Sequence, residues 1–281
     1  MESIIGAAVT RVVRASEEPA GERIRKFGFS GSLRICELPG VIKAMEEQMS
    51  DAETQRLGCA CLLNVTAGDA TRKQAVVENG GLAAIVASMR AHPTDEVVVR
   101  RGCGALLNCA YGDAACKKAV LAAGAAAVLV SAMVHHHGDV EVARSCCCAL
   151  AQVAGGDAAC KQAVVGAGGA KAVVRAMGRH SGDVEVQRDG CCALRDMAAG
   201  DDDARKKAAV AAGGPATVVE AMGWHVCDVL VQLFGCAALS NMANGDSECR
   251  QAVLGAGGLS ALEAAGGALG EPTSFVVGMG A

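Results

Sequence analysis

Residues 112–124 read Gly-Asp-Ala-Ala-Cys-Lys-Lys-Ala-Val-Leu-Ala-Ala-Gly, and a close copy returns at 156–168. The opening pair recurs as Gly68-Asp69, Gly112-Asp113, Gly156-Asp157, Gly200-Asp201 and Gly245-Asp246. The steps between these pairs are 44, 44, 44 and 45 residues, a period that is typical of solenoid repeats. Because a unit this small cannot bury its own apolar face, we expect the units to stack into one elongated array with an open binding surface.

The composition favours helices that pack through small side chains. Hydrophobic residues make up 52% of the 281 residues and aromatic residues only 2%, so Ala, Val, Leu, Met and Cys must fill the core. The formal charge of −4 predicts no nucleic-acid partner, since nucleic acids attract clustered Lys and Arg. No apolar run approaches transmembrane length without Gly or a charge, which predicts no membrane insertion.

Most of the fifteen cysteines occupy repeat-equivalent places inside apolar runs. One shared position holds Cys59, Cys103, Cys147, Cys191 and Cys236, and a second holds Cys116, Cys160 and Cys249. This placement predicts small buried hydrophobic side chains. Together with the absence of a signal-peptide pattern, it predicts a reducing compartment, the cytoplasm, with the nucleus as the alternative.

The unit from Gly112 to Ala154 predicts three helices. Asp113 is placed to cap the first, which should stop at Gly124, where a residue free to adopt positive φ is needed. A second helix is expected from about Ala125 to Val134, and Asp139 is placed to cap a third, which is the longest. A methionine recurs once per repeat on the second helix and is predicted to be core; the row is Met45, Met89, Met133, Met177 and Met222.

The third helix carries the motif by which the chain resembles a known family. It reads Gly-Cys-Ala-Cys-Leu-Leu-Asn-Val-Thr-Ala-Gly-Asp at 58–69 and Gly-Cys-Ala-Ala-Leu-Ser-Asn-Met-Ala-Asn-Gly-Asp at 235–246. These residues resemble the armadillo repeat, a three-helix unit. The resemblance implies an all-α, right-handed armadillo-type solenoid. We expect a degenerate N-terminal cap at 1–37, the repeat array at 38–266 and a C-terminal tail at 267–281.

For function, the resemblance implies a non-catalytic scaffold or adaptor that binds an extended or helical segment of a partner protein. In armadillo proteins the third helices line a concave groove, and an Asn on each holds the main chain of the partner peptide. The corresponding positions here are Asn64, Asn108, Gln152, Asp196 and Asn241. An alternative from the residues alone is that these amides bond to one another along the ladder and satisfy a polar seam.

A row of arginines lies eight residues before the Asn position. Its members are Arg56, Arg100, Arg144 and Arg188. Three of them follow a Glu by three residues (Glu53, Glu141 and Glu185), so surface (i, i+3) pairs would account for them. The functional alternative is a basic lip that contacts an acidic partner segment through bidentate carboxylate contacts.

Two other interpretations remain open, an importin-alpha-like adaptor for basic cargo and a purely architectural array in a larger assembly. The import members of the family carry a Trp one turn before the Asn. The matching positions here are Ala60, Gly104, Cys148, Cys192 and Ala237. Without an aromatic wall a basic peptide loses cation–π attraction, which weighs against the import interpretation.

The sequence predicts no enzyme, no cofactor and no metal site. No nucleophile elbow, phosphate loop or zincin motif occurs in a convincing context, and the Gly-Gly pairs fall at inter-helix turns with no preceding strand. The run His135-His136-His137 lacks the ligand spacing of zinc sites and is better explained as a helix C-terminus. The partner's identity and the oligomeric state are not specified by the sequence.

Overall fold

The structure is a computed structural model that describes residues 35–269 and, for side chains, residues 35–266. Every element in this range is helical, and the helices fall into three rows. A short 3-10 helix, η1 (Ile35–Glu37), precedes them. First helices of the repeats are α5 (Ala70–Glu78), α8 (Ala114–Ala122), α11 (Ala158–Gly166), α14 (Asp203–Ala211) and α17 (Ser247–Gly255). Second helices are α3 (Leu38–Glu47), α6 (Gly81–Ala91), α9 (Ala125–His135), α12 (Gly169–Arg179), α15 (Gly214–Trp224) and α18 (Gly258–Leu269). Third helices are α4 (Ala52–Thr66), α7 (Glu96–Ala110), α10 (Val140–Ala154), α13 (Val184–Ala198) and α16 (Val229–Ala243).

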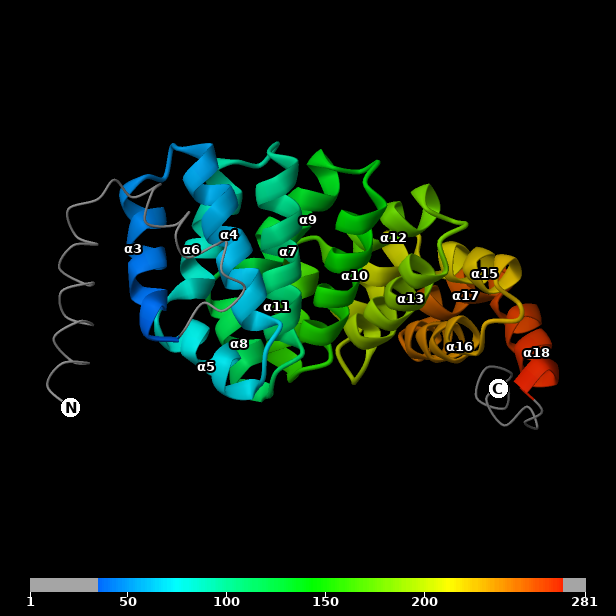
Figure 1. The fold of residues 1–281 in the computed structure, drawn as a ribbon. Coiled ribbons are helices and arrows are strands. Elements are labelled where there is room, and N and C mark those ends of the chain that lie inside the picture. Colours follow the sequence, from blue (N-terminus) through cyan, green and yellow to red (C-terminus); the bar gives the residue numbers. More distant parts are fainter. Residues whose placement is uncertain (1–34, 270–281) are drawn as a thin grey trace, which may run out of the picture. The chain divides into compact units, whose positions relative to one another are not determined.

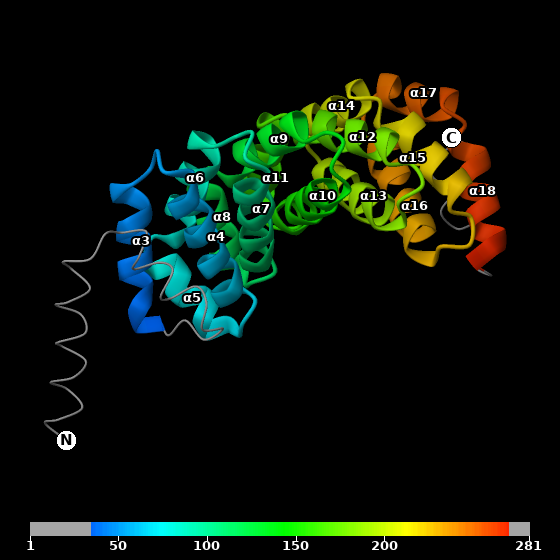
Figure 2. The ribbon, with the colours of Figure 1, turned by 45° about the horizontal axis from the view of Figure 1, so that its top comes forward.

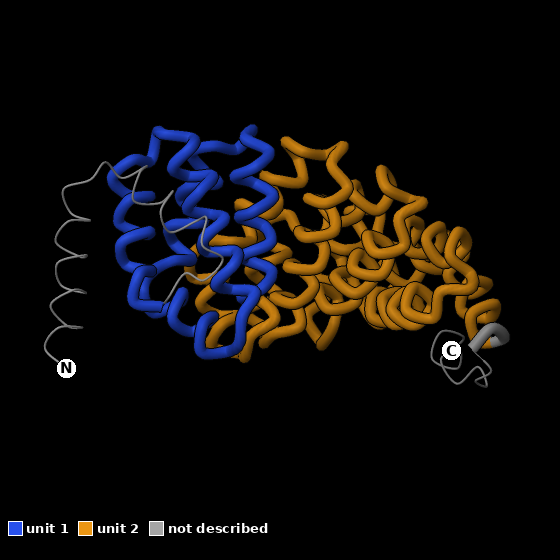
Figure 3. Tube along the Cα trace, viewed as in Figure 1, with its two compact units in different colours: residues 1–109 blue, residues 110–281 orange. Residues whose placement is uncertain are grey.

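The chain divides into two compact units between Cys109 and Ala110, near the end of α7 (Figure 3). In the second unit, helices of the same row are neighbours. The third helices α10, α13 and α16 pack in succession, as Figures 1 and 2 both show. The second helices α9, α12, α15 and α18 do the same, and so do the first helices α8, α11, α14 and α17. This stacking of equivalent helices confirms the predicted all-α solenoid.

Asp side chains start the first helices, as predicted. The carboxylate of Asp113 accepts a hydrogen bond from the backbone N–H of Cys116 at 2.9 Å, and Asp157 caps α11 in the same way through Cys160. Each such cap contributes about 1 kcal/mol to helix stability. The fourth pair differs, because α14 is capped by Asp202 and not by Asp201. The extra residue of the 45-residue step therefore sits in this turn.

Glycines with positive φ separate the first and second helices. Gly124 has φ 84°, and its equivalents Gly80, Gly168, Gly213 and Gly257 lie between φ 79° and φ 91°. Because L-residues with a side chain avoid this region, the turn requires glycine. The prediction that the first helix stops at Gly124 is confirmed, with α8 ending at Ala122 and α9 running to His135.

The core lies between the three rows and is built from small residues and methionines. The methionine row of the second helices is buried, between 0% and 7% exposed, and the first cysteine row is between 0% and 8% exposed. In four of the five repeats the third helix places a glycine opposite the methionine, and in α10 Cys146 takes that position. A Cβ added at Gly190 would lie 2.5 Å from Cγ and Sδ of Met177. The close approach of α12 to α13 thus depends on this missing side chain.

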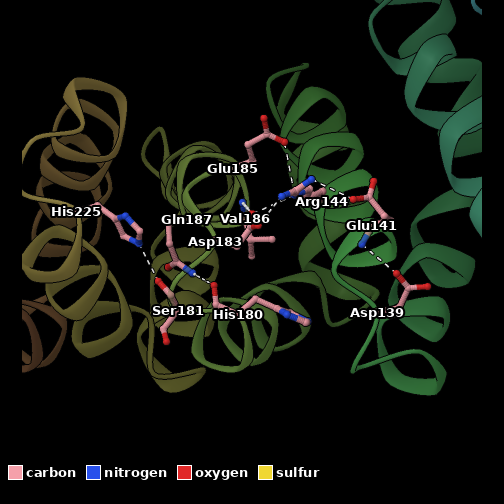
Figure 4. A network of polar contacts seen from close by, with 10 residues as sticks. All are labelled: Asp139, Glu141, Arg144, His180, Ser181, Asp183, Glu185, Val186, Gln187 and His225. Atoms are coloured by element: carbon pink, nitrogen blue, oxygen red, sulfur yellow. Dashed lines mark hydrogen bonds and ion pairs between the residues drawn. The ribbon is translucent and has the colours of Figure 1, made fainter.

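A buried glutamine on the third helix satisfies the C-terminus of the second helix. Gln187 Nε2 donates to the carbonyl oxygen of His180 at 3.0 Å (Figure 4). It also donates to the carbonyl oxygen of Met177 at 2.9 Å. Gln55 and Gln232 make the equivalent bonds in their repeats. Since the last carbonyls of a helix have no partner within the helix, the glutamine supplies the missing donors.

The predicted domain boundaries of 37 and 266 stay predictions, because most of the expected cap (1–37) and tail (267–281) lies outside the described residues. Among residues 35–269, no single helix is long and apolar enough to cross a membrane. Helices α8 and α9 meet that criterion only as a pair, and the pair is bent by 67°.

Candidate functional site

The third helices of the second unit present a lattice of half-buried residues to solvent. On each helix, three residues at spacing i, i+3 and i+7 lie on one face. The lattice consists of Ser145, Cys148 and Gln152 on α10, Asp189, Cys192 and Asp196 on α13, and Phe234, Ala237 and Asn241 on α16. All are partly accessible except Cys148, which is 7% exposed. Three members of the predicted Asn row, Gln152, Asp196 and Asn241, form one edge of this surface.

The structure places the five residues of the Asn row in different environments. Asn64 is exposed on α4, whereas Asn108 donates from Nδ2 to the Thr66 hydroxyl at 3.4 Å. Asn241 donates from Nδ2 to the carbonyl oxygen of Arg195 at 2.9 Å. In the described part of the chain, these bonds tie the amides to the preceding third helix and do not join them to one another.

At the fourth position, Asp196 is paired with its neighbour in sequence. Arg195 donates to the Asp196 carboxylate through Nε at 2.8 Å and through Nη2 at 3.0 Å. The same guanidinium donates to the Cys192 sulfur at 3.2 Å and lies 4.7 Å from the ring centroid of Phe234. Arg195 therefore neutralises Asp196 and bridges α13 to α16.

Arg195 is a residue that the sequence interpretation missed. Its repeat equivalents are Leu63, Leu107, Ala151 and Ser240, none of them charged. This departure from the row was the available signal. Its consequence could not be read from the sequence, because Phe234 belongs to the next repeat.

Asp189 is the electrostatically unusual group of the lattice. Burial raises the pKa of its carboxyl to about 6, although the hydrogen bond with Cys148 acts to lower that pKa. The Cys148 sulfur in turn lies 3.0 Å from the hydroxyl of Tyr111. A carboxyl that has lost hydration without gaining a full ionic partner favours its protonated form.

The thiols of this face are unreactive. Burial raises the pKa of Cys148 to about 12 and that of Cys192 to about 11. Since the thiolate is the nucleophilic form, neither sulfur is activated for covalent chemistry at neutral pH. Among the described residues, no group of three or more His, Cys, Asp and Glu side chains is arranged to hold a metal ion.

The arginine row connects successive repeats. Arg144 donates to the Asp183 carboxylate through Nε at 3.1 Å and Nη2 at 2.6 Å, while Nη1 meets Glu141 at 3.0 Å (Figure 4). Arg56 and Asp95 form the same pair in the first unit. The expected (i, i+3) partner is present for Arg144, and the stronger partner is the Asp that caps the next third helix.

The remaining arginines follow or vary this arrangement. Arg188 pairs with Asp228 on both carboxylate oxygens, whereas Arg100 meets Glu96 at 3.0 Å, four residues away on its own helix. The pairing raises the pKa of Arg188 and lowers the pKa of Asp228 to about 2. A part for this row in partner binding stays a prediction.

The repeat histidines form a third inter-repeat contact. His225 Nε2 lies 2.7 Å from the carbonyl oxygen of Ser181 (Figure 4). His180 Nε2 lies 3.1 Å from the carbonyl oxygen of His137. In the first unit, His92 reaches the carbonyl of Met49 at 2.7 Å. These histidines are the C-cap residues of their second helices, and they also contact the turn of the preceding repeat.

A surface pocket of about 500 Å³ lies on the second-helix side of the second unit, away from the lattice. Met133 and His136 line it from α9 and the following turn, and Arg175 and Arg179 from α12. It contains none of the predicted site residues.

Comparison with solved structures identifies the fold. An engineered protein is 29% identical, with a TM-score of 0.71 over 87% of this chain and 98% of that chain. A designed armadillo repeat protein in complex with the peptide (KR)4 is 23% identical, with a TM-score of 0.68 over 83% of this chain and 98% of that one. Computationally designed armadillo repeat proteins for modular peptide recognition are 24% identical, with a TM-score of 0.69 over 83% of this chain and 99% of theirs. No protein-family model and no curated protein sequence matches the chain. The expectation of an armadillo-like repeat fold is confirmed.

Proposed function

We propose that this armadillo-type solenoid is a non-catalytic scaffold that binds a segment of a partner protein along its third-helix face. The fold is shared with designed proteins whose stated purpose is peptide recognition. The chemistry of the face supports binding over catalysis, because its thiols are protonated and its Asp196 carboxylate is held by Arg195.

The observation that carries the proposal is the unused hydrogen-bonding capacity of the amide row. Within the described residues, the amides of Asn64 and Gln152 make no hydrogen bond. Asn108 and Asn241 each use one N–H, which leaves their carbonyl oxygens as acceptors. A primary amide offers two donors and an acceptor, so each position can pair with both groups of a peptide unit.

The spacing of the row suits an extended main chain. Packed helices lie about 10 Å apart. An extended segment advances about 3.3 Å per residue. Successive third helices would therefore meet every third residue of the partner, and the partner's remaining side chains would lie over Ser145, Asp189 and Phe234 on the lattice.

A basic partner segment is the second candidate, and Asp189 favours it. Its carboxyl has lost hydration without a full ionic partner, and a Lys or Arg of the partner would supply one. Binding would then weaken at raised salt and below about pH 6. The absence of Trp from the matching row still weighs against an import-type adaptor.

The arginine row would add a second contact with the partner. A basic lip would use the outer edges of Arg56, Arg144 and Arg188, whose side chains are 35% to 41% exposed although they bind Asp within the array. We propose the cytoplasm, or the nucleus, as the compartment. The free thiols of all fifteen cysteines are consistent with a reducing environment.

The test selects binding peptides from a display library of random linear sequences. The full chain is compared with the variant Asn64→Ala/Asn108→Ala/Asn241→Ala. We expect an enriched motif whose binding is lost in this variant while helicity and melting temperature change little. The control Gln162→Ala/Gln251→Ala removes exposed amides from α11 and α17 and should leave binding intact. Equal binding by the wild type and the Asn variant would show that the amide row is not the binding site, and no enrichment would support the architectural alternative.

A further inference from the structure

A cluster of apolar side chains lies exposed at the end of α15 and the start of α16. Its members, here called the end cluster, are Trp224, Val226, Val229, Leu230 and Leu233, with exposed fractions of 74%, 59%, 61%, 42% and 46%. Scattered apolar residues on a surface are ordinary, but five within ten positions form a patch that water solvates poorly. The cluster uses no residue of the proposed binding face.

Comparison between repeats shows that the cluster replaces polar residues. Leu230 and Leu233 stand where α13 has Glu185 and Arg188. In that repeat the arginine binds Asp228, the cap of the next third helix. The position of Leu233 therefore faces the place where a further third helix would begin.

The repeat register assigns the residues that follow α18 to this place. Helix α18 packs beside α15 and α16, as the other second helices pack beside their predecessors (Figure 2). The three residues that follow the closing histidine lead from a second to a third helix in the preceding repeats. Continuing this register, residues 270–272 correspond to 226–228, and Phe275 corresponds to Val231. Residues 270–281 lie outside the described part of the structure.

Polar residues of the earlier repeats are replaced by apolar ones both in the end cluster and in the residues at the end of α18 and beyond it. Pro272 stands where the capping Asp would be, so an arginine at position 233 would have no partner. Leu269 stands where a histidine would bind the carbonyl of Val226. The register position of Phe275 is held in four third helices by a valine that is fully buried: Val98, Val142, Val186 and Val231. Matched changes on the two sides point to contact between them.

We propose that residues 273–279, Thr-Ser-Phe-Val-Val-Gly-Met, dock on the end cluster and close the array as the start of a further third helix. Phe275 packs toward α16, and Val276 and Val277 cover Leu230 and Leu233. The segment thereby removes apolar surface from water at about 25 cal/mol per Å². About four or five residues suffice to connect Leu269 to the end cluster, since an extended chain advances about 3.3 Å per residue.

Hydrogen exchange on the full chain tests the proposal directly. The amides of residues 275–279 should exchange at least about tenfold more slowly than in an unstructured chain. Phe275→Asp should abolish that protection, because it places a charge at a buried position. The matched control Ser274→Asp puts the same charge at the position of Glu141 and Glu185, which is exposed, and should keep the protection.

The fluorescence of Trp224 provides a second measurement, because it is the only tryptophan in the chain. Phe275→Asp should increase its quenching by acrylamide, and Ser274→Asp should not. Leu233→Arg should loosen the segment as Phe275→Asp does. Absence of protection at 275–279 in the wild type, or equal behaviour of the two Asp variants, would overturn the proposal. Protection that rises with protein concentration, with a dimer in sedimentation, would assign the cluster to a second copy instead.

Discussion

Arg188 on α13 binds the carboxylate of Asp228, the residue that caps α16 through the backbone N–H of Val231 at 3.0 Å. One aspartate thus starts a helix and joins two repeats. Because the Asp228 side chain is only 16% exposed, the pair is partly shielded from water.

Removing the Asp228 carboxylate should lower the free energy of unfolding more than removing the Arg188 guanidinium. Asp228→Ala loses a helix cap and leaves Arg188 unpaired, for a loss of about 1–2 kcal/mol in the free energy of unfolding. Arg188→Ala loses the ion pair alone, at about 0.5–1 kcal/mol. Urea denaturation of both single variants and the double variant measures these losses. Additive losses would show that the two side chains act independently.

Asp189 should make the protein more stable in mild acid. Its folded pKa of about 6 lies above the unfolded value, so the folded state binds more protons between about pH 4 and pH 6. The free energy of unfolding should therefore rise as pH falls from 7 toward 5. Asp189→Asn should flatten this rise and stabilise the chain at pH 7 by about 1 kcal/mol, since the half-buried carboxylate keeps some hydration.

Below pH 4 the dependence should reverse. The pKa of Asp228 is lowered to about 2 by Arg188, and that of Asp246 to about 2 by Lys207. Groups with a lowered folded pKa contribute stability above the unfolded pKa and lose it as the pH falls toward 2. A melting temperature that declines steadily from pH 7 to pH 5 would contradict the assignment of Asp189.

Two glycine substitutions should have opposite signs. Gly190→Ala introduces a Cβ within 2.5 Å of Met177, and overpacking of this kind costs about 1–3 kcal/mol, offset in part by the better helix propensity of alanine. Gly178→Ala, on α12, meets no atom within 4 Å and should stabilise by up to about 1 kcal/mol. Thermal melting of the two variants separates packing from propensity. Equal stabilisation by both would show that Met177 simply moves aside.

Thiol labelling should distinguish two cysteines from the rest. Cys36 and Cys227 are exposed, Cys192 is half-buried with a pKa raised to about 11 by burial, and the other twelve are buried. A water-soluble maleimide at pH 7 should modify the two exposed thiols first, and the buried thiols only on unfolding. Peptide mass spectrometry identifies the sites. Rapid labelling of Cys147 in the native protein would mean that the core opens.

Local signals made the helices predictable. Asp113 and Gly124 mark helix boundaries through a hydrogen bond and a backbone dihedral angle that involve only a few neighbouring residues. All the residues that take part are therefore visible in a short stretch of sequence. The candidate site was predictable as a set of positions, because repetition places Asn64, Asn108 and Asn241 in one row. Their surroundings were not predictable, since those depend on residues of the neighbouring repeat.

The sequence alone determined the three-helix unit, its period and its core rows, because capping, positive φ and helical periodicity act over at most a few turns. Only the tertiary structure decided how the units join. Arg188 had Glu185 three residues away, yet it binds Asp228, forty residues away; Asn241 reaches the carbonyl of Arg195, 46 residues away. Stacking brings such groups within 3 Å of each other, and the choice among polar partners follows from that geometry.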